Sequence, residues 1–288
     1  MAETKTITMS QGQFDKLRKI IYDRAGIHFP DAKKYVLESR LARRLEELEV
    51  DDYDQYISFL SMGPYKDDEF QEMFNKITIN ETSFFRNEPQ LEVFEKQALP
   101  KILEARAGVK RLRVWSAACS SGEEPYTLAM IVHRALGIRM ADWKVEILGS
   151  DISEKVLADA QSGRYTDYSM RTTNSLVKSR YFKQEGQQWM LDEQIKKMVN
   201  FQLHNLKDRL GAKRFGTFDV IFCRNVMIYF DDAMKDTVLQ CFSDQLASDG
   251  TLFIGHSENI RTSNLFTAMP IAQGFCYRKA KVAAKLAA

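Results

Sequence analysis

Two adjacent acids, Glu123 and Glu124, follow a run of very small residues at positions 117–122, AACSSG. The segment before this run, RLRVWSAA, is typical of a buried strand, and EEPYTLAMIVHRALG after it is typical of an amphipathic helix. Small side chains at such a turn let a ligand approach the backbone, which is where open α/β sheets bind ligands. Two carboxylates at that place favour a ligand that carries positive charge.

The same turn distinguishes between kinds of nucleotide ligand. A dinucleotide-binding turn has the pattern G-x-G-x-x-G, and here Ala117, Cys119 and Gly122 occupy the three glycine positions. A helix N-terminus ordinarily attracts phosphate, but Glu123 and Glu124 would repel a pyrophosphate. They suit an ammonium and a sulfonium, both of which S-adenosylmethionine carries. The structural alternative is an acidic first turn that only complements the helix dipole.

Polar residues also end the next two predicted strands. Asp151 ends WKVEILGSDI, where a carboxylate can accept hydrogen bonds from both ribose hydroxyls of an adenosine ligand. Its alternative role is that of N-cap for the helix SEKVLADA, which is compatible with the first. Asn205 lies at the end of the predicted strand VNFQLHNL and is placed to read an adenine edge, unless it is an ordinary loop asparagine.

The elements that position these residues alternate after Pro100. Further strands are expected in FDVIFCRNVMIYF and GTLFIGHSE, with the helix DAMKDTVLQCFSDQL between them. Strands that alternate with helices predict an α/β fold with a doubly wound, mostly parallel sheet. Residues 165–198 break the alternation and predict a small inserted β-subdomain, with short strands around a turn at Glu185 and Gly186.

The first 85 residues show helical periodicity and no strand alternation. QFDKLRKIIYDRAGI has apolar residues at the spacing of one helix face and Gly26 as a stop, and AKKYVLESRLARRLEEL carries a leucine stripe. DDYDQYISFLSM and DDEFQEMFNKITI predict two more helices. We therefore expect a helical domain at 1–85, an α/β domain at 86–280 and a disordered tail at 281–288.

Composition excludes several function classes. A net charge of +2 over 288 residues gives no argument for nucleic acid as a partner. The four cysteines form no C-x-x-C pair and the four histidines are scattered, which argues against a metal site. The N-terminus lacks the apolar region of a signal peptide, and no apolar run is long enough to insert into a membrane. These features predict a cytoplasmic protein.

Several of these segments, in this order, closely resemble the CheR family of chemotaxis receptor glutamate methyltransferases. The matching stretches are NETSFFR, VWSAACSSGEEPY, GSDIS, HNL, FDVIFCRNVMIYF and GHSE, and the resemblance covers nearly the whole chain. It implies a sheet of the S-adenosylmethionine-dependent methyltransferase type. It also implies methyl transfer to glutamate side chains on the cytoplasmic helices of chemoreceptors, which leaves S-adenosylhomocysteine and needs no metal.

The resemblance also assigns roles by position. It implies cofactor contacts from Asn80, Thr82, Arg86, Glu124, Asp151, Asn205, Leu206, Arg224 and Asn225. The acid matching Glu124 would hold the methionine ammonium, and the acid matching Asp151 the ribose. Tyr229 matches a tyrosine that lines the reaction site, with a core tyrosine as the alternative. Arg86 is our candidate to hold the acceptor carboxylate, although it could serve mainly the cofactor.

The chemistry is consistent with these assignments. A glutamate has a reference pKa of about 4.3, so its carboxylate is already ionised at neutral pH and needs no general base. The enzyme must align the carboxylate with the methyl group and exclude water, and alignment of this kind supplies roughly 7–11 kcal/mol in favourable cases.

A basic stripe predicts how the acceptor is chosen. Lys33, Arg40, Arg43 and Arg44 fall within roughly a 100° arc on one side of the second helix. They would steer an acidic receptor helix into one register, whereas the alternative is a solvated helix face. The inserted segment offers only the short loop FKQEGQQW, with one glycine, which argues against tethering to a receptor C-terminal peptide. We expect a monomer.

Other functions remain as alternatives. RNVMIY loosely resembles the N-P-P-Y element of amino-methylating enzymes but lacks both prolines, so a methyltransferase acting on nucleic acid is disfavoured and one acting on another protein stays open. A non-catalytic module that binds S-adenosylmethionine and signals to a partner also stays open. A nicotinamide dehydrogenase is rejected because of the acidic first turn and the missing glycines.

Overall fold

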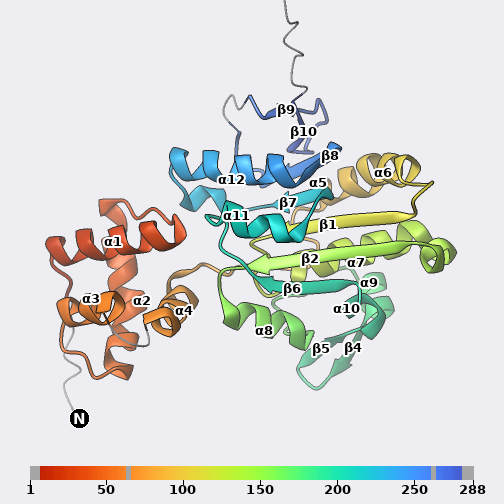
Figure 1. The fold of residues 1–288 in the computed structure, drawn as a ribbon. Helices are drawn as coiled ribbons and strands as arrows, with labels where there is room; N and C mark the ends of the chain where they lie inside the picture. The colour runs from red at the N-terminus through yellow and green to blue at the C-terminus, as the bar shows by residue number, and fades with distance from the viewer. Residues whose placement is uncertain (1–6, 63–65, 261–263, 281–288) are drawn as a thin grey trace, which may run out of the picture.

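The N-terminal part of the protein is a bundle of four helices. The structure is a computed structural model that describes residues 7–62, 66–260 and 264–280. Within these residues the bundle contains α1 (Gln11–Ala25), the 3₁₀ helix η1 (Asp31–Lys33), α2 (Lys34–Glu47), α3 (Tyr53–Met62) and α4 (Lys66–Ile77). Figure 1 shows it as a separate lobe, coloured red to orange. The bundle confirms the predicted all-helical domain.

Local sequence explains where the first helix begins and ends. Ser10 accepts a hydrogen bond from the backbone N–H of Gln13, and the Gln13 side chain accepts one from the Ser10 N–H, which makes a capping box. Gly26 ends the helix with φ +71°, a left-handed conformation that costs glycine little. The leucine stripe of α2 lies in the bundle core, where Leu37, Leu41 and Leu45 are fully buried.

The second part is built on a central sheet. Seven strands of the described residues form it in the order β6-β2-β1-β7-β8-β10-β9. The first five run parallel, and β10 runs antiparallel to both its neighbours. The strands are β1 (Arg111–Ala117), β2 (Lys144–Asp151), β6 (Val199–Leu203), β7 (Phe218–Cys223), β8 (Leu246–Ile254), β9 (Phe266–Ala268) and β10 (Cys276–Lys279). This topology confirms the doubly wound, mostly parallel sheet.

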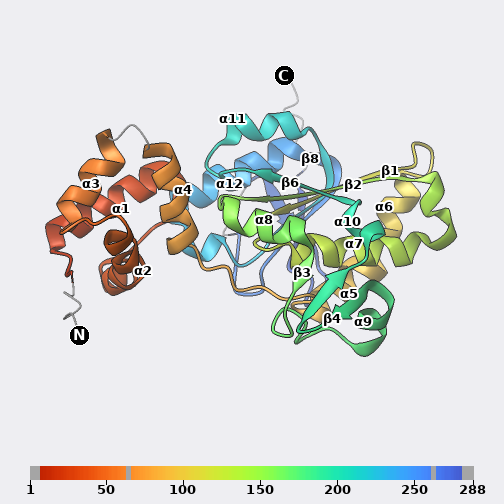
Figure 2. The same ribbon diagram turned by 90° about the horizontal axis from the view of Figure 1, so that it is seen from below.

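Helices cover both faces of this sheet. Val114 and Trp115 are neighbours on β1, yet they belong to two different cores, because successive strand side chains point to opposite faces. One face packs α5 (Glu88–Val93), the π-helix η2 (Phe94–Ala98), α6 (Leu99–Ala105), η3 (Gly137–Asp142), α7 (Glu123–Leu136) and α8 (Glu154–Ser162). The other packs α11 (Arg209–Ala212), η4 (Lys213–Phe215) and α12 (Asp232–Gln245) (Figure 2).

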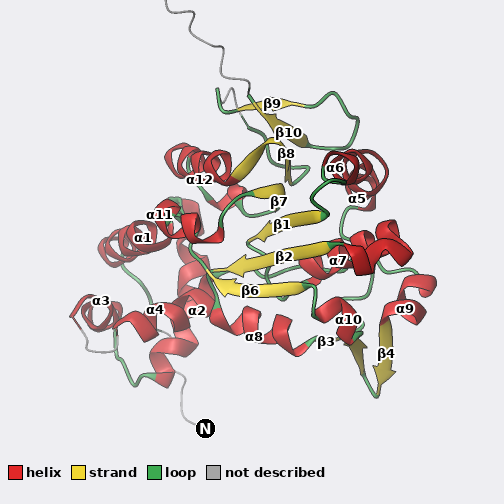
Figure 3. Ribbon diagram, turned by 45° about the vertical axis from the view of Figure 1, so that its right-hand side comes forward, coloured by secondary structure: helices red, strands yellow, loops and turns green. Residues whose placement is uncertain are grey.

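A small antiparallel sheet interrupts the alternation between α8 and β6, as predicted. It contains β3 (Arg164–Tyr165), β4 (Phe182–Glu185) and β5 (Gln188–Leu191) in the order β3-β5-β4, with α9 (Ser175–Tyr181) and α10 (Glu193–Lys196) beside it. Figure 3 shows β4 projecting beyond the main sheet. Glu185 pairs with Gln188, so the connecting loop is only residues 186–187.

The structure differs from the sequence-based expectations in three places. Ser153, and not Asp151, caps α8, because its hydroxyl accepts from the N–H of Val156. The consecutive helices α5, η2 and α6 were not predicted because Pro100 falls inside the stretch, and the short antiparallel strands β9 and β10 were not predicted either. The predicted tail at 281–288 lies outside the described residues. Among the described helices, none is long and apolar enough to cross a membrane.

Candidate active site

A tight turn after β1 carries the first acid of the site. Ala118 (φ +61°), Ser120 (φ +50°) and Gly122 (φ +90°) are all left-handed, a conformation that concentrates at functional sites. A Cβ on Gly122 would come within 2.8 Å of the Ala160 side chain, so the position needs glycine. The turn leads directly into α7, whose second residue is Glu124.

Glu124 is a buried acid paired with a buried base. It accepts a hydrogen bond from the Ser116 hydroxyl (2.7 Å) and forms an ion pair with Arg224 (3.2 Å), whose side chain is only 4% exposed. Burial raises the pKa of Glu124, while Arg224 and Ser116 oppose the rise. Burial likewise lowers the pKa of Arg224. The Nε of Arg224 is buried without a partner among the described residues, so one of its donors is left for a ligand.

Glu123 faces away from this pair. It accepts hydrogen bonds from the hydroxyls of Ser121 (2.7 Å) and Ser169 (2.9 Å), and Ser169 precedes the inserted subdomain's α9. Burial raises its pKa too. Of the two acids that were expected to meet a cationic ligand, only Glu124 remains placed to do so, and its contact with a ligand stays a prediction. Glu123 fastens the turn to the inserted segment.

Asp151 lies at the carboxyl end of β2 and has no cation in its hydrogen-bond set. Its oxygens accept from the backbone N–H of Ser120 (2.9 Å) and Ser153 (3.1 Å). Burial raises the pKa of Asp151, and these N–H groups oppose the rise. The loop after β6 lies nearby, and burial lowers the pKa of its His204 to about 4.

Asn205, which was predicted to lie beside adenine, contacts the helical domain. The Asn205 amide donates to the carbonyl of Arg24 at the end of α1 (2.6 Å), and its oxygen accepts from the N–H of Lys207 (3.0 Å). Leu206 is buried. The Asn205 side chain is thus already engaged by the protein, and a contact from it to adenine stays a prediction.

The loop that follows β7 is organised by an acid that the sequence analysis did not assign. The Glu258 carboxylate accepts the backbone N–H groups of Asn225 (3.0 Å), Val226 (2.9 Å), Met227 (2.8 Å) and Gly255 (2.6 Å). A Cβ on Gly255 would lie 2.6 Å from this carboxylate. The loop carries Tyr229, whose pKa is raised by burial. The GHSE segment was noticed in the sequence, but its partners lie too far along the chain to be inferred.

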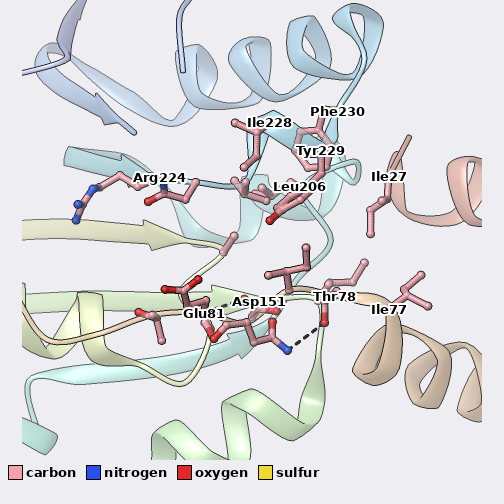
Figure 4. Close-up of a pocket in the computed structure, with 18 of the residues that line it drawn as sticks. Ile27, Ile77, Thr78, Glu81, Asp151, Leu206, Arg224, Ile228, Tyr229 and Phe230 are labelled. Carbon is pink, nitrogen blue, oxygen red and sulfur yellow. Dashed lines mark hydrogen bonds between the residues drawn. The ribbon is translucent and has the colours of Figure 1, made fainter. Parts of the chain in front are cut away.

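The predicted site residues meet around one cavity of about 620 Å³ between the helical bundle and the sheet. All ten residues predicted to contact the cofactor or line the reaction site line it: Asn80, Thr82, Arg86, Glu124, Asp151, Asn205, Leu206, Arg224, Asn225 and Tyr229. Figure 4 shows Glu81, Asp151 and Arg224 toward one side, and Ile27, Ile77 and Phe230 toward the other. The cavity thus has a polar part and an apolar part, as small-molecule sites usually do.

The four residues of the predicted basic stripe divide into two groups, and Lys33 lies in η1, just before α2, and not on the second helix as expected. Lys33 and Arg40 line the cavity, and the guanidinium of Arg40 also donates to the carbonyl of Ile77. Arg43 is 81% exposed and pairs with Glu47 (3.1 Å). Arg44 instead forms a 2.5 Å ion pair with Glu69, whose side chain is 2% exposed. Arg44 thus holds α2 on α4, and the predicted docking stripe rests on the other three residues.

The sequence of this chain matches the models of two known protein domains. Residues 12–78 match the domain described as "CheR methyltransferase, all-alpha domain", and residues 80–275 match "CheR methyltransferase, SAM binding domain". The chain belongs to the CheR methyltransferase family. The two matches meet at residues 78–80, which connect α4 to the cavity wall.

Relatives support this membership over almost their whole length. The chain is 36% identical to a chemotaxis protein methyltransferase of Borreliella burgdorferi over 270 residues, which cover 92% of this chain and 94% of that one. It is 39% identical to the chemotaxis protein methyltransferase of Salmonella typhimurium, with coverage of 91% and 88%. The corresponding Escherichia coli protein is 37% identical, with coverage of 89% and 87%.

The cavity of this CheR-family protein fits S-adenosylmethionine by its chemistry. Burial raises the pKa values of the Glu124 and Asp151 carboxyls, and an ammonium beside Glu124 and ribose hydroxyls beside Asp151 would favour their ionised forms. The unpartnered Nε of Arg224 suits the ligand's own carboxylate. Among the described residues, no group of three or more His, Cys, Asp or Glu is arranged to hold a metal ion.

Proposed function

We propose that this CheR-family methyltransferase transfers the methyl group of S-adenosylmethionine to glutamate carboxylates on the cytoplasmic helices of chemoreceptors. The products are a glutamate methyl ester and S-adenosylhomocysteine, and no metal takes part. The observation that supports this best is a single cavity that joins the buried Glu124–Arg224 pair to a cationic rim. Lys33, Arg40 and Arg86 all line it, and cations at the rim suit an anionic acceptor.

In this proposal each residue of the site has a separate role. The cofactor, when bound, supplies an electrophilic methyl group. Glu124 and Arg224 hold its amino-acid end, and Asp151 holds its ribose. Arg86 orients the acceptor carboxylate: its Nη1 donates to the Glu81 carbonyl (2.7 Å), which uses one of its five donors and fixes the guanidinium. Tyr229 lines the path between them.

The apolar part of the cavity has a function in the same reaction. An anion and a cation combine into neutral products, so strong hydration of the separated charges slows the step. Ile27, Ile77 and Phe230 narrow the cavity with side chains that exclude water (Figure 4). The glutamate is already ionised at neutral pH, so positioning and desolvation are what the protein must supply.

The deciding experiment is methyl transfer from labelled S-adenosylmethionine to a chemoreceptor cytoplasmic fragment, followed by mild alkali. Alkali-labile label released as methanol would establish a carboxyl ester. Alkali-stable label would mean methylation of another group and would contradict the proposal. Arg86→Lys provides the site control: we expect lower turnover with an unchanged melting temperature, since a lysine cannot reproduce the planar fork. Wild-type turnover in that variant would refute the role of Arg86.

We infer further that the protein acts in the cytoplasm as a monomer and without a receptor tether. The β4–β5 turn of the inserted subdomain is only residues 186–187, which supports this inference because a two-residue turn offers little surface to a peptide. Calorimetric titration with an isolated receptor C-terminal peptide should therefore give no binding heat. A measurable affinity would contradict the tether-free mode and would leave the methyl-transfer proposal untouched.

A further inference from the structure

Three large apolar side chains at the cavity mouth are exposed to solvent. Tyr35 is 63% exposed, and Ile79 and Ile228 are each 49% exposed. They line the same cavity but come from three different segments: α2, the connection after α4, and η5 (Met227–Tyr229). We call these three residues the apolar collar. Exposed apolar residues are ordinary when scattered singly, but a group of them around a site marks a binding surface.

The collar lies among cations. Lys33 lies two positions before Tyr35 in the sequence, and Arg40 and Arg86 line the same cavity. A partner that satisfies both sets must present an acid with apolar side chains on more than one side of it. A second copy of this chain would instead bring like charges together.

An α-helix meets this requirement with little ordering cost. Residues three and four positions before and after a given residue share its face, so a glutamate on an amphipathic helix has apolar neighbours one turn away in both directions. The three collar residues belong to both domains and to the segment that connects them. Residues of both domains thus line the cavity, which fits a helix that contacts both domains as it lies across the opening.

We propose that the apolar collar determines which glutamates are modified. It would accept apolar side chains one helical turn from the target glutamate, while Lys33 and Arg43 attract the helix without reading its sequence. This inference rests on the proposed function, because it takes the acceptor to be a helical receptor segment. It adds the substrate class: glutamates with apolar residues on the same helix face, in preference to glutamates with polar or charged neighbours.

The test uses Tyr35→Ser and Ile79→Ser, with Ile138→Ser as the matched control. Ile138 is fully exposed and lies in η3, away from the cavity lining. Binding of a receptor cytoplasmic fragment is measured in the presence of S-adenosylhomocysteine, separately from methyl transfer. We expect each collar variant to weaken fragment binding and raise KM about five- to tenfold, while kcat at saturation and S-adenosylhomocysteine affinity stay near wild type. Ile138→Ser should behave as wild type.

A matched substrate completes the test. In a second fragment, the apolar residues one turn before and after the modified glutamate are replaced by serine. Wild-type enzyme should discriminate between the two fragments, and Tyr35→Ser should discriminate less. Equal discrimination, or fragment binding that is indifferent to the collar, would overturn the inference. If binding depends on the collar but no ester forms, the proposed function fails and the docking surface stands.

Discussion

The buried acids of the site are balanced in two different ways, and this difference sets their roles. Glu258 is surrounded by four backbone N–H donors, which complete its hydrogen-bonding capacity within the protein. Glu124 is balanced by Arg224, itself left with an unpartnered Nε. The first arrangement is closed and builds a loop, whereas the second is open and can receive a ligand.

Glu258→Gln tests the closed arrangement. Each oxygen of Glu258 accepts two N–H groups, so either orientation of an amide places an NH₂ against two donors. We expect a loss of about 2 kcal/mol in the free energy of unfolding and at least a tenfold drop in kcat, because the loop carries Asn225 and Tyr229. Glu88→Gln removes an exposed acid as a control. A variant with wild-type kcat would show that the loop keeps its shape without this carboxylate.

The open arrangement predicts a pH effect. The pKa values of Glu124 and Asp151 are raised by burial, so the stability that these groups contribute is present at low pH and is lost as pH rises through the raised pKa values. A cationic ligand favours the ionised forms and reverses this preference. Binding of S-adenosylhomocysteine should therefore weaken on mild acidification and release protons there. Calorimetry in two buffers of different ionisation enthalpy measures the release, and no proton exchange would contradict the prediction.

At the scale of elements, one loop connects the cofactor side of the cavity to α1. The Lys207 ammonium donates to the carbonyls of Tyr22 (2.8 Å) and Asp23 (2.6 Å), and Asn205 donates to that of Arg24. These carbonyls lie in the last turn of α1, where that of Tyr22 also accepts from the N–H of Gly26, and a cation there complements the helix dipole. The loop that borders the cavity thus caps the first helix of the helical domain.

Lys207→Met should loosen this connection. We expect the free energy of unfolding to fall by about 1 kcal/mol and KM for a receptor fragment to rise, because the helical wall of the cavity loses a fixed position. Lys207→Arg should restore most of the effect. Lys16→Met removes an exposed lysine of α1 and is the control for loss of a lysine. If limited proteolysis of residues 78–87 is unchanged in Lys207→Met, the loop does not fix the two domains.

The same elements show how far the sequence could predict the molecule. Gly26 ends α1 where the sequence placed the stop, and the leucines of α2 lie in the bundle core, because caps and periodicity are local signals. Glu258 and its loop partners are 31–33 positions apart, and Arg44 and Glu69 are 25 apart. Pairs of this kind depend on the tertiary fold, so a charge pattern alone could not separate structural Arg44 from exposed Arg43.

For the whole molecule, the important feature is that the helical domain contacts the loop that carries Tyr229. The N–H of His28 donates to the carbonyl of Tyr229 (2.9 Å), and Ile27 forms an antiparallel bridge with Phe230. The segment after α1 is therefore joined by backbone hydrogen bonds to the loop that carries Tyr229. In the proposed function, a receptor helix that docks on the bundle would contact a surface joined by backbone hydrogen bonds to this loop.

If the basic residues of the helical domain attract an acidic receptor helix over a distance, the reaction rate should depend on salt. At about 0.1 M salt the Debye length is about 10 Å, and at 1 M it is about 3 Å, so a rate that depends on steering should fall as salt is added. The double variant Lys33→Gln and Arg43→Gln should react more slowly than wild type at low salt, with a shallower salt dependence, and approach it at high salt. Lys19→Gln removes an exposed lysine from an i,i+4 pair like that of Arg43, and should keep the wild-type slope. Equal slopes in all three proteins would mean that contact at the cavity mouth, and not the basic stripe, selects the acceptor.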